Sequence, residues 1–391
     1  MDEMAADELK QKLDGLIKKT GAFDCVECGK CTSLCPITKE NPDFAPRLIV
    51  VKALEGMSEQ ITSSRDIWIC LTCGRCSAKC PYKVNYTEFI RGMRETARKG
   101  GNAPACSEGG LMNSLANLMT KEGVKQNRLG WVDESMKIAQ KGEYLLFTGC
   151  APYLAVTFGE KDDHVLEGTR AAVRILNKLG ITPVVSAEER CCGHDQFWSG
   201  DRETFEKLAH LNIAWIKSTG AKIVLVTCPE CFRTLLKDYQ KVDPEFDIDV
   251  LHISEFLADQ LEDGNLKFTK EVNETVTYHD GCRLARHIGV VEEPRLLLEK
   301  VPGLKLVEME SSGEDSSCCG VSALMNCDST SKAIQLKRLK EAKATGASRM
   351  LAFCPKCRIH FKCSRTGTLP FPKEEVDIEV VDFLEVLDRA I

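Results

Sequence analysis

The sequence has no excess of basic residues. Its 391 residues include 52 Lys and Arg against 58 Asp and Glu, which gives a formal net charge of −6. Domains that bind nucleic acid usually carry a basic patch that contacts phosphates. The charge balance therefore argues against a nucleic-acid partner.

Long apolar runs are also missing. No uninterrupted apolar stretch approaches the roughly 20 residues that a membrane-spanning helix needs, so we expect no direct membrane span. The segment MDEMAADELK is acidic and polar, unlike a secretory signal. These absences predict a cytoplasmic protein and leave open a peripheral attachment to a membrane complex.

Glycine-rich phosphate motifs are absent as well. No G-x-G-x-x-G follows a predicted strand, and the chain contains no G-x-x-x-x-G-K-[ST]. We therefore expect nucleotide or flavin chemistry to reside on another subunit.

Cysteine, by contrast, is abundant, with 21 residues. The runs CVECGKCTSLCP, from Cys25, and CLTCGRCSAKCP, from Cys70, both read C-x2-C-x2-C-x3-C-P, the bacterial ferredoxin pattern. Structural zinc sites usually pair one C-x2-C with a distant second pair, so zinc fits poorly. In two-cluster proteins the fourth cysteine of each run ligates the other cluster. The pattern predicts two cubane [4Fe-4S] clusters, one held by Cys25, Cys28, Cys31 and Cys80, and one by Cys70, Cys73, Cys76 and Cys35.

The two parts of the chain differ in their predicted secondary structure. Residues 1–140 read as helices around cysteine loops, whereas apolar strands alternate with helices from about residue 142, which predicts parallel sheets. The strands EYLLFTGC, TPVVSA, AKIVLVTC and DVLHIS precede a second set that includes TVTYHDGC and SRMLAFC. The pattern repeats at an offset of about 127 residues, which also relates Phe256 to Phe383 and signals a duplication. The predicted fold class is α + α/β, with a helical two-[4Fe-4S] ferredoxin-like domain at 1–140 and duplicated α/β modules at 141–268 and 269–391.

Each predicted module contains five cysteines in one order: a cysteine after a strand, a Cys-Cys-Gly, and a Cys-Pro-x-Cys. The carboxyl ends of parallel strands form one rim of a sheet, so we expect these thiols to converge there. Pro229 and Pro355 suit the first position of a helix. Buried structural cysteines would not account for the same order twice, which indicates metal binding. The two sets are Cys150, Cys191, Cys192, Cys228 and Cys231, and Cys282, Cys318, Cys319, Cys354 and Cys357.

Several histidines lie close to these cysteines in the sequence. His194 follows the first Cys-Cys-Gly, His279 and Asp280 precede Cys282, and His287 follows it. Each histidine could donate a proton to a leaving thiolate or simply form a structural hydrogen bond, and both alternatives stay open here. The remaining cysteines are interpreted as structural, and they are Cys106, Cys327 and Cys363.

The repeated Cys-Cys-Gly arrangement resembles the cysteine-rich CCG domain of heterodisulfide reductases. With two ferredoxin runs before it, the chain is similar to the form in which a small ferredoxin-like subunit and the catalytic subunit are fused. The resemblance extends from Cys25 to Cys357. It implies two noncubane [4Fe-4S] clusters, one per five-cysteine set, and a disulfide substrate split between them. The residues expected at the catalytic site are Cys192, Cys319 and His194.

The same resemblance leaves an alternative function open. CCG domains also occur in iron–sulfur subunits of glycolate, lactate and glycerol-3-phosphate dehydrogenases, and in sulfite-reduction and benzoyl-CoA reductase complexes. The chain would then transfer electrons without a substrate site of its own. In either case we expect an electron-donating subunit, a flavoprotein or a membrane cytochrome.

Overall fold

The computed structural model describes residues 3–160, 162, 164–325, 327–365 and 372–391. Over these residues the chain forms two compact units. The first unit comprises the described parts of Met1–Leu115, Asp195–Phe205 and Gly320–Ile334, and the second those of Ala116–His194, Glu206–Cys319 and Gln335–Ile391. The predicted domains 1–140, 141–268 and 269–391 stay a prediction; the second unit contains the sheets of both predicted modules.

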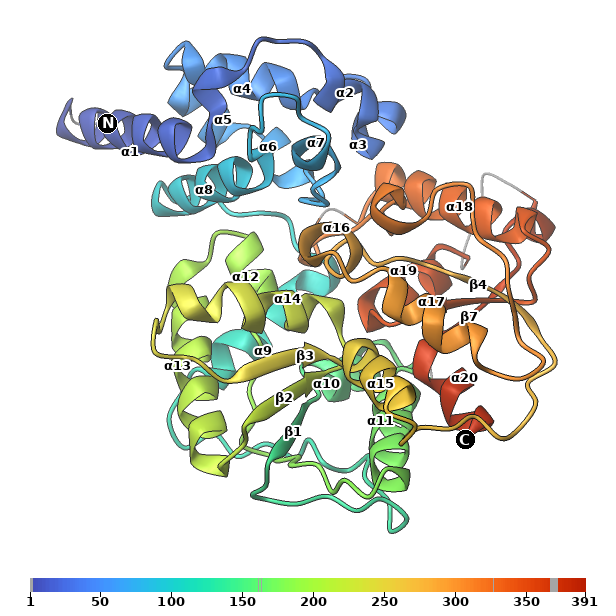
Figure 1. Ribbon diagram of the computed structural model, residues 1–391. Helices are drawn as coiled ribbons and strands as arrows, with labels where there is room; N and C mark the ends of the chain where they lie inside the picture. Colours follow the sequence, from blue (N-terminus) through green and yellow to red (C-terminus); the bar gives the residue numbers. More distant parts are fainter. Residues whose placement is uncertain (1–2, 161, 163, 326, 366–371) are drawn as a thin grey trace. The chain divides into compact units, whose positions relative to one another are not determined.

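The first unit is helical, as the sequence predicts (Figure 1). Helix α1 (Glu3–Thr20) buries Leu13 and Ile17 and packs along α8 (Tyr86–Lys99). Helix α8 begins after Asn85, whose side chain accepts a hydrogen bond from the N–H of Glu88 and so caps the helix. The helices between α1 and α8 are short, and the two cysteine loops lie among them. These helices are α2 (Lys30–Leu34), α3 (Pro36–Glu40), α4 (Pro46–Leu54), α5 (Ser58–Ser63), α6 (Asp66–Ile69) and α7 (Arg75–Ala78).

The first α/β module has a parallel sheet in the order β1-β2-β3. Its strands are β1 (Tyr144–Phe147), β2 (Ile223–Val226) and β3 (Asp249–His252), and they confirm three of the predicted strands. The strand predicted in TPVVSA is wrong: Val184 forms only isolated bridges, with Ala139 and Leu145, because the chain turns at residues 187–188 just after it. The helices from residue 111 to residue 262 are α9 (Leu111–Met119), α10 (Ala151–Phe158), α11 (Glu167–Lys178), α12 (His194–Trp198), α13 (Arg202–Thr219), α14 (Pro229–Lys237) and α15 (Ile253–Glu262).

The second module repeats this plan with a parallel sheet in the order β5-β4-β6-β7. Its strands are β4 (Thr275–Tyr278), β5 (Lys305–Leu306), β6 (Arg349–Ala352) and β7 (Glu379–Asp382). The prediction of duplicated modules with parallel sheets is therefore confirmed. The helices are α16 (Ala285–Ile288), α17 (Glu292–Glu299), α18 (Ser329–Ala344), α19 (Pro355–Ser364) and α20 (Phe383–Ala390).

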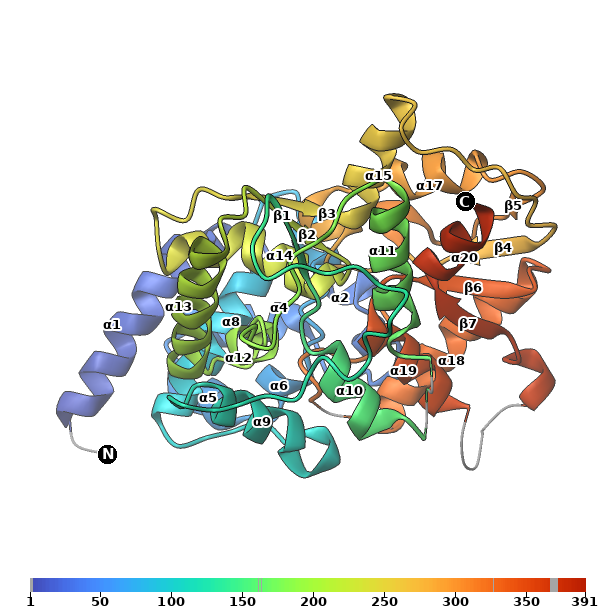
Figure 2. The same ribbon diagram turned by 90° about the horizontal axis from the view of Figure 1, so that it is seen from below.

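The two modules contact each other reciprocally. Helix α11 packs against α20, and α15 packs against α17, as Figures 1 and 2 both show. Because α11 corresponds to α17 and α15 corresponds to α20, the same pair of elements meets twice. Such a reciprocal contact is the pattern of a twofold interface, here a pseudo-twofold within one chain.

The end of each module shows where the predicted repeat offset fails. Helices α15 and α20 both begin with a capping box, formed by His252 with Glu255 and by Asp382 with Glu385. His252 and Asp382 are therefore equivalent, and so are the residues that follow them, Ile253 and Phe383. The predicted match of Phe256 with Phe383 is wrong. Both positions are apolar and lie on the buried face of a helix, which made the shifted alignment look plausible.

The strand ends place the cysteines at the carboxyl rim of each sheet, as predicted. Cys150 and Cys228 follow β1 and β2, and Cys282 and Cys354 follow β4 and β6. Among the described residues, no helix is long and apolar enough to cross a bilayer.

Candidate functional site

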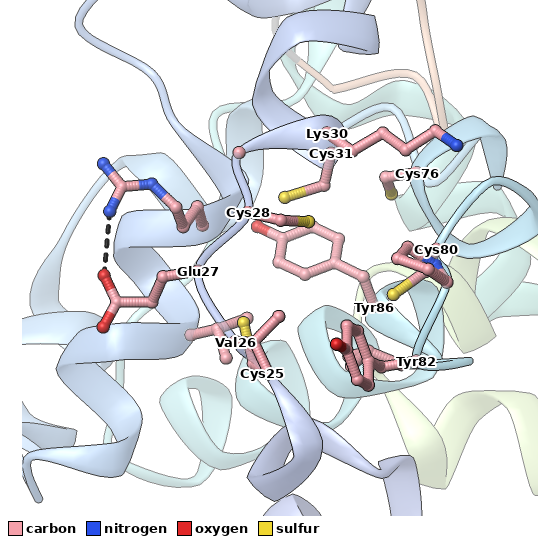
Figure 3. A pocket seen from close by; sticks show the side chains of 15 residues that line it. Cys25, Val26, Glu27, Cys28, Lys30, Cys31, Cys76, Cys80, Tyr82 and Tyr86 are labelled. Atoms are coloured by element: carbon pink, nitrogen blue, oxygen red, sulfur yellow. Dashed lines mark hydrogen bonds and ion pairs between the residues drawn. The ribbon is translucent and has the colours of Figure 1, made fainter.

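The first unit contains a cavity lined by cysteines from both N-terminal runs. Figure 3 shows the sulfur atoms of Cys25, Cys28 and Cys31 directed toward the same space as that of Cys80, with the ring of Tyr86 behind them. Cys76 lines the cavity as well. Following the ferredoxin pattern, we call Cys25, Cys28, Cys31 and Cys80 the first cubane set, which combines three residues of one run with the last cysteine of the other.

The remaining cysteines of the two runs also lie together, and we call them the second cubane set: Cys35, Cys70, Cys73 and Cys76. Burial raises the pKa of the Cys35 thiol to about 12, and its neighbours Cys70 and Cys73 add to the rise. The pKa of Cys76 is likewise raised by burial and by the other three thiols of the set. A bound cationic cluster would reverse these rises, because the thiolate is the form that ligates metal.

Both cysteine loops have the backbone conformation that anion and iron–sulfur sites use. In the first run Glu27 and Gly29 have φ values of 54° and 77°, and in the second Thr72 and Gly74 have 47° and 80°. Left-handed residues within such a turn direct successive N–H groups inward, as in many iron–sulfur sites. The N–H of Thr72 donates to Cys70 Sγ at 3.3 Å. The residues of both sets therefore fit a [4Fe-4S] cluster.

The ten cysteines of the two CCG sets form one continuous string in the second unit. Thiol–thiol contacts link consecutive members of each set, and a contact between Cys228 and Cys354 joins the two sets. These two residues occupy equivalent positions in the modules, so the string is symmetric about its centre. Its order is Cys150, Cys191, Cys192, Cys231, Cys228, Cys354, Cys357, Cys319, Cys318 and Cys282.

Local structure explains why the string can form. Cys150, Cys228 and Cys354 are the N-cap residues of α10, α14 and α19, and each helix has proline within its first two positions, as predicted for Pro229 and Pro355. The positive end of each helix dipole favours a thiolate there. Gly149 has a φ of +62°, and a Cβ on it would lie 2.6 Å from Cys231 Sγ. Only glycine therefore lets the chain before Cys150 pass so close to the next thiol of the set.

The thiols of the string differ in their pKa values. Hydrogen bonds from neighbouring thiols lower the pKa of Cys192, Cys228 and Cys319, in each case more than burial raises it. The pKa values of their partners Cys231 and Cys357 are raised well above the usual range. Without a cation the string can thus hold only some thiolates, whereas a metal cluster would ionise all of them. This donor set fits iron–sulfur clusters.

The centre of the string carries one carboxylate and one ammonium group. Glu230 and Lys356 occupy equivalent places, each between the two cysteines of a Cys-Pro-x-Cys, and they form an ion pair. The ligand atoms of Cys228, Glu230 and Cys354 all lie within 4.8 Å of one another. The modules are therefore alike in cysteines but opposite in charge at the pseudo-twofold.

His194 is buried beside this pair. Its Nδ1 lies 3.5 Å from Glu230 Oε2, and its Nε2 accepts a hydrogen bond from Arg283 Nε at 3.0 Å. Arg283 Nη1 also contacts His287 Nε2 at 2.9 Å. The proton of a neutral His194 thus belongs on Nδ1, facing Glu230.

The other two predicted polar residues have structural partners. His279 Nδ1 accepts from Arg338 Nε at 3.2 Å, and burial lowers the pKa of this histidine well below its usual value. Asp280 accepts hydrogen bonds from both Nη atoms of Arg295, at 2.9 and 3.0 Å. These contacts favour the structural alternative for His279 and give Asp280 a structural ion pair with Arg295.

A buried ion pair supports the loop that carries Cys150. Arg128 Nη2 contacts Glu189 Oε1 at 2.8 Å, and the same carboxylate accepts from the backbone N–H groups of Thr148 and Gly149. Arg128, Arg283, Glu230 and Lys356 were missed by sequence reasoning. The opposite charges inside the two Cys-Pro-x-Cys motifs were the one signal that could have found two of them.

The three remaining cysteines lie outside both cubane sets and the string. Cys106 accepts a hydrogen bond from Asn113 Nδ2 at 2.8 Å, Cys327 is exposed, and Cys363 lies in α19. Their structural role stays a prediction.

Comparison with known proteins agrees with this geometry. The cysteine-rich CCG domain matches residues 144–236 and 276–362, and the 4Fe-4S dicluster domain matches residues 5–84. The chain is 31% identical to the D subunit of the dihydromethanophenazine:CoB–CoM heterodisulfide reductase of Methanosarcina mazei, over 94% of this chain and 93% of that one. It is 30% identical to the B subunit of the fumarate reductase (CoM/CoB) of Methanothermobacter marburgensis, over 94% of this chain and 72% of that one.

Two further similarities are more limited. The EtfAB:quinone oxidoreductase of Syntrophomonas wolfei is 34% identical over 49% of this chain and 27% of its own length. The crystal structure of a hypothetical protein from Helicobacter pylori superposes with a TM-score of 0.53 at 12% identity, covering 90% of this chain and 69% of that one, and shares the fold. With its cysteine string, its dicluster unit and its nearly full-length similarity to a heterodisulfide reductase polypeptide, the chain belongs to the family of heterodisulfide reductase D subunits and is an iron–sulfur electron-transfer oxidoreductase subunit that carries [4Fe-4S] clusters.

Proposed function

We propose that this chain reduces a disulfide at the middle of the ten-cysteine string, using electrons from a partner subunit. The continuity of the string across Cys228 and Cys354 carries the proposal, because it brings both five-cysteine sets to one place, where a single disulfide could react with both. The proposed cofactors are two cubane clusters, one on each cubane set, and two noncubane clusters, one on each half of the string. When bound, these clusters supply the redox chemistry, taking up electrons one at a time and providing the two that a disulfide consumes.

Cleavage of the disulfide bond consumes two electrons and two protons and yields two thiols. A substrate with two sulfur atoms suits a pseudo-twofold site, since each half of the string offers the same thiol arrangement to one end. Cys192 and Cys319 hold equivalent places in the two halves, and we assign them as catalytic ligands. In this proposal the Nδ1–H group of His194 donates a hydrogen bond to one departing thiolate, which takes its proton from solvent, and Glu230 holds the imidazole in position.

The pair of Glu230 and Lys356 would make the two ends of the site unequal. An ammonium group stabilises a nearby thiolate, whereas a carboxylate disfavours one. The end of the disulfide nearer Lys356 would therefore leave more easily as a thiolate, while the end nearer His194 would be protonated on departure.

Relatives of this chain are subunits of larger reductases, so it works with electron-transfer partners. A flavoprotein or a membrane cytochrome is the proposed donor. The similarity to the EtfAB:quinone oxidoreductase favours a second candidate function, in which the chain only relays electrons. That relative matches just half of this chain, so disulfide reduction is the function that we favour.

Mediated electron transfer separates the two functions. The anaerobically purified chain, without its partner, should oxidise reduced methyl viologen when a small thiol disulfide is added, and should release two thiols per two electrons. Inactivity toward a panel of symmetrical and mixed disulfides, with the clusters fully reducible by viologen, would contradict disulfide reduction and support the relay.

A further inference from the structure

The guanidinium of Arg94 is buried against the second cysteine run. Arg94 extends from α8 and is fully buried. Its Nε donates to the carbonyl of Ile67 at 2.7 Å, and its Nη2 donates to the carbonyl of Cys70 at 2.5 Å. Its Nη1 donates to the carbonyl of Trp198 at 2.8 Å. A positive charge is thus fixed beside the loop that begins at Cys70.

The first cysteine run has different electrostatic surroundings. Its loop contains Glu27, which pairs with Arg47 at 2.9 Å between Oε2 and Nη1. Their side chains are 52% and 32% exposed, so water screens a pair that is neutral in sum. Cys28 is exposed, whereas Cys70 and Cys73 are buried. Lys30 also lines the cavity of the first set, but it is exposed, so water screens its charge as well. Buried fixed charge therefore acts on the second run and not on the first.

Burial and fixed charge have opposite effects on a cluster. Reduction adds a negative charge, which burial disfavours and a nearby cation favours, and the attraction is stronger where the effective dielectric constant is low. We propose that Arg94 raises the reduction potential of the cluster on the second cubane set above that of the cluster on the first. An electron that arrives at the first set, of which Cys28 is exposed, is then more stable on the second.

This inference rests on the proposed cubane assignment and not on the substrate. A failure of disulfide reduction would leave it intact, because cubane potentials are measured without any disulfide present. Conversely, Arg94 could have no effect on the potentials while the chain still reduces a disulfide.

Arg94 also has a structural role that the test must separate from its charge. The carbonyls of Ile67 and Trp68 belong to α6, and the last carbonyls of a helix need donors from outside it. Arg94→Lys keeps the charge but loses most of these hydrogen bonds, whereas Arg94→Gln keeps a donor and loses the charge. A purely structural role predicts similar potentials in both variants.

The experiment is a redox titration of the anaerobically purified full chain, monitored by electron paramagnetic resonance. Cys28→Ser identifies the signal of the first cubane set. Arg94→Gln should shift the redox equilibrium of the second set at least tenfold toward the oxidised form, about 59 mV for a one-electron couple. Arg94→Lys should stay near the wild type. The matched control is Arg91→Gln on the same helix, which removes a guanidinium paired with Glu88 and Glu95 and should move neither potential.

Three outcomes would overturn the proposal. The first is an unchanged potential of the second set in an iron-replete Arg94→Gln chain, and the second is an equal shift of that potential in Arg94→Lys. The third is measured on the wild type alone and stands even if Arg94→Gln binds no second cluster: a reduction potential of the second set below that of the first.

Discussion

Replacing Cys319 with alanine should abolish disulfide reduction while the cubane clusters remain reducible. Cys319 contacts Cys318 and Cys357 in the string, so its loss removes a ligand from one half of the proposed site. A disulfide needs both halves, and residues that act as one unit lose activity together, here by about a thousandfold or more. Viologen-dependent disulfide reduction measures the loss, and absorbance changes on reduction report the cubanes.

The equivalent substitution in the other half of the string is the second variant of this experiment. Cys192→Ala should be as inactive as Cys319→Ala, and the double variant should be no worse than either single one. Cys363→Ala is the matched control, because Cys363 lies in α19 of the same module but outside the string. Native-rate turnover in a Cys319→Ala chain that has lost its cluster would show that one half suffices, and the shared site would then be wrong.

Replacing Arg358 with methionine should destabilise the chain by about 3–5 kcal/mol, because removal of one partner strands a buried charge. The Arg358 side chain is 1% exposed and lies between the modules. Its Nη2 contacts Asp382 at 3.4 Å and donates to the Val165 carbonyl at 2.9 Å, and its Nη1 lies 4.0 Å from Asp162. The shift in the midpoint of thermal or urea unfolding measures the loss.

The loss of stability caused by Arg358→Met should also depend on pH. Burial raises the pKa of Asp382 to about 7, although Arg358 opposes the rise. Since this pKa lies above that of an unfolded aspartate, about 3.9, the contribution of Asp382 to stability is full below pH 4 and disappears as pH rises through 7. Without Arg358 the carboxylate is disfavoured further, so the variant should lose more stability at pH 8 than at pH 5.

Asp382→Asn is the partner variant, since asparagine keeps the N-cap of α20 while removing the charge. In the Asp382→Asn background, the loss caused by Arg358→Met should be smaller and nearly independent of pH. Lys222→Met, which breaks an exposed pair with Glu143, should change stability by less than about 0.5 kcal/mol. A loss from Arg358→Met that grows toward acid pH would contradict this account.

The sequence was most informative where chemistry and local geometry coincide. Within each N-terminal run, the cysteine spacing predicted a compact ligand loop, because the residues of such a loop are near neighbours in the chain. The apolar strands before Cys150, Cys228 and Cys354 were also predictable, because the residues of a buried strand form one contiguous apolar segment of the sequence.

Features that depend on distant contacts were not predictable. Nothing local in the chain indicates that residues 195–205 and 320–334, which follow the two Cys-Cys-Gly motifs, belong to the helical unit. Nor does the spacing of each set indicate that Cys228 touches Cys354. The equivalence of Glu230 and Lys356 was visible in the duplication, but their pairing required the pseudo-twofold contact of the modules.

Iron content tests the central claim most directly, because the string is the basis of the proposed site. Two cubane and two noncubane four-iron clusters predict about 16 iron atoms per anaerobically purified chain, with a matching amount of acid-labile sulfide. Mössbauer spectra should then divide the iron equally between cubane and noncubane environments. A fully loaded chain with about 8 iron atoms, all in cubane clusters, would leave the ten-cysteine string without its clusters and would contradict the proposed function.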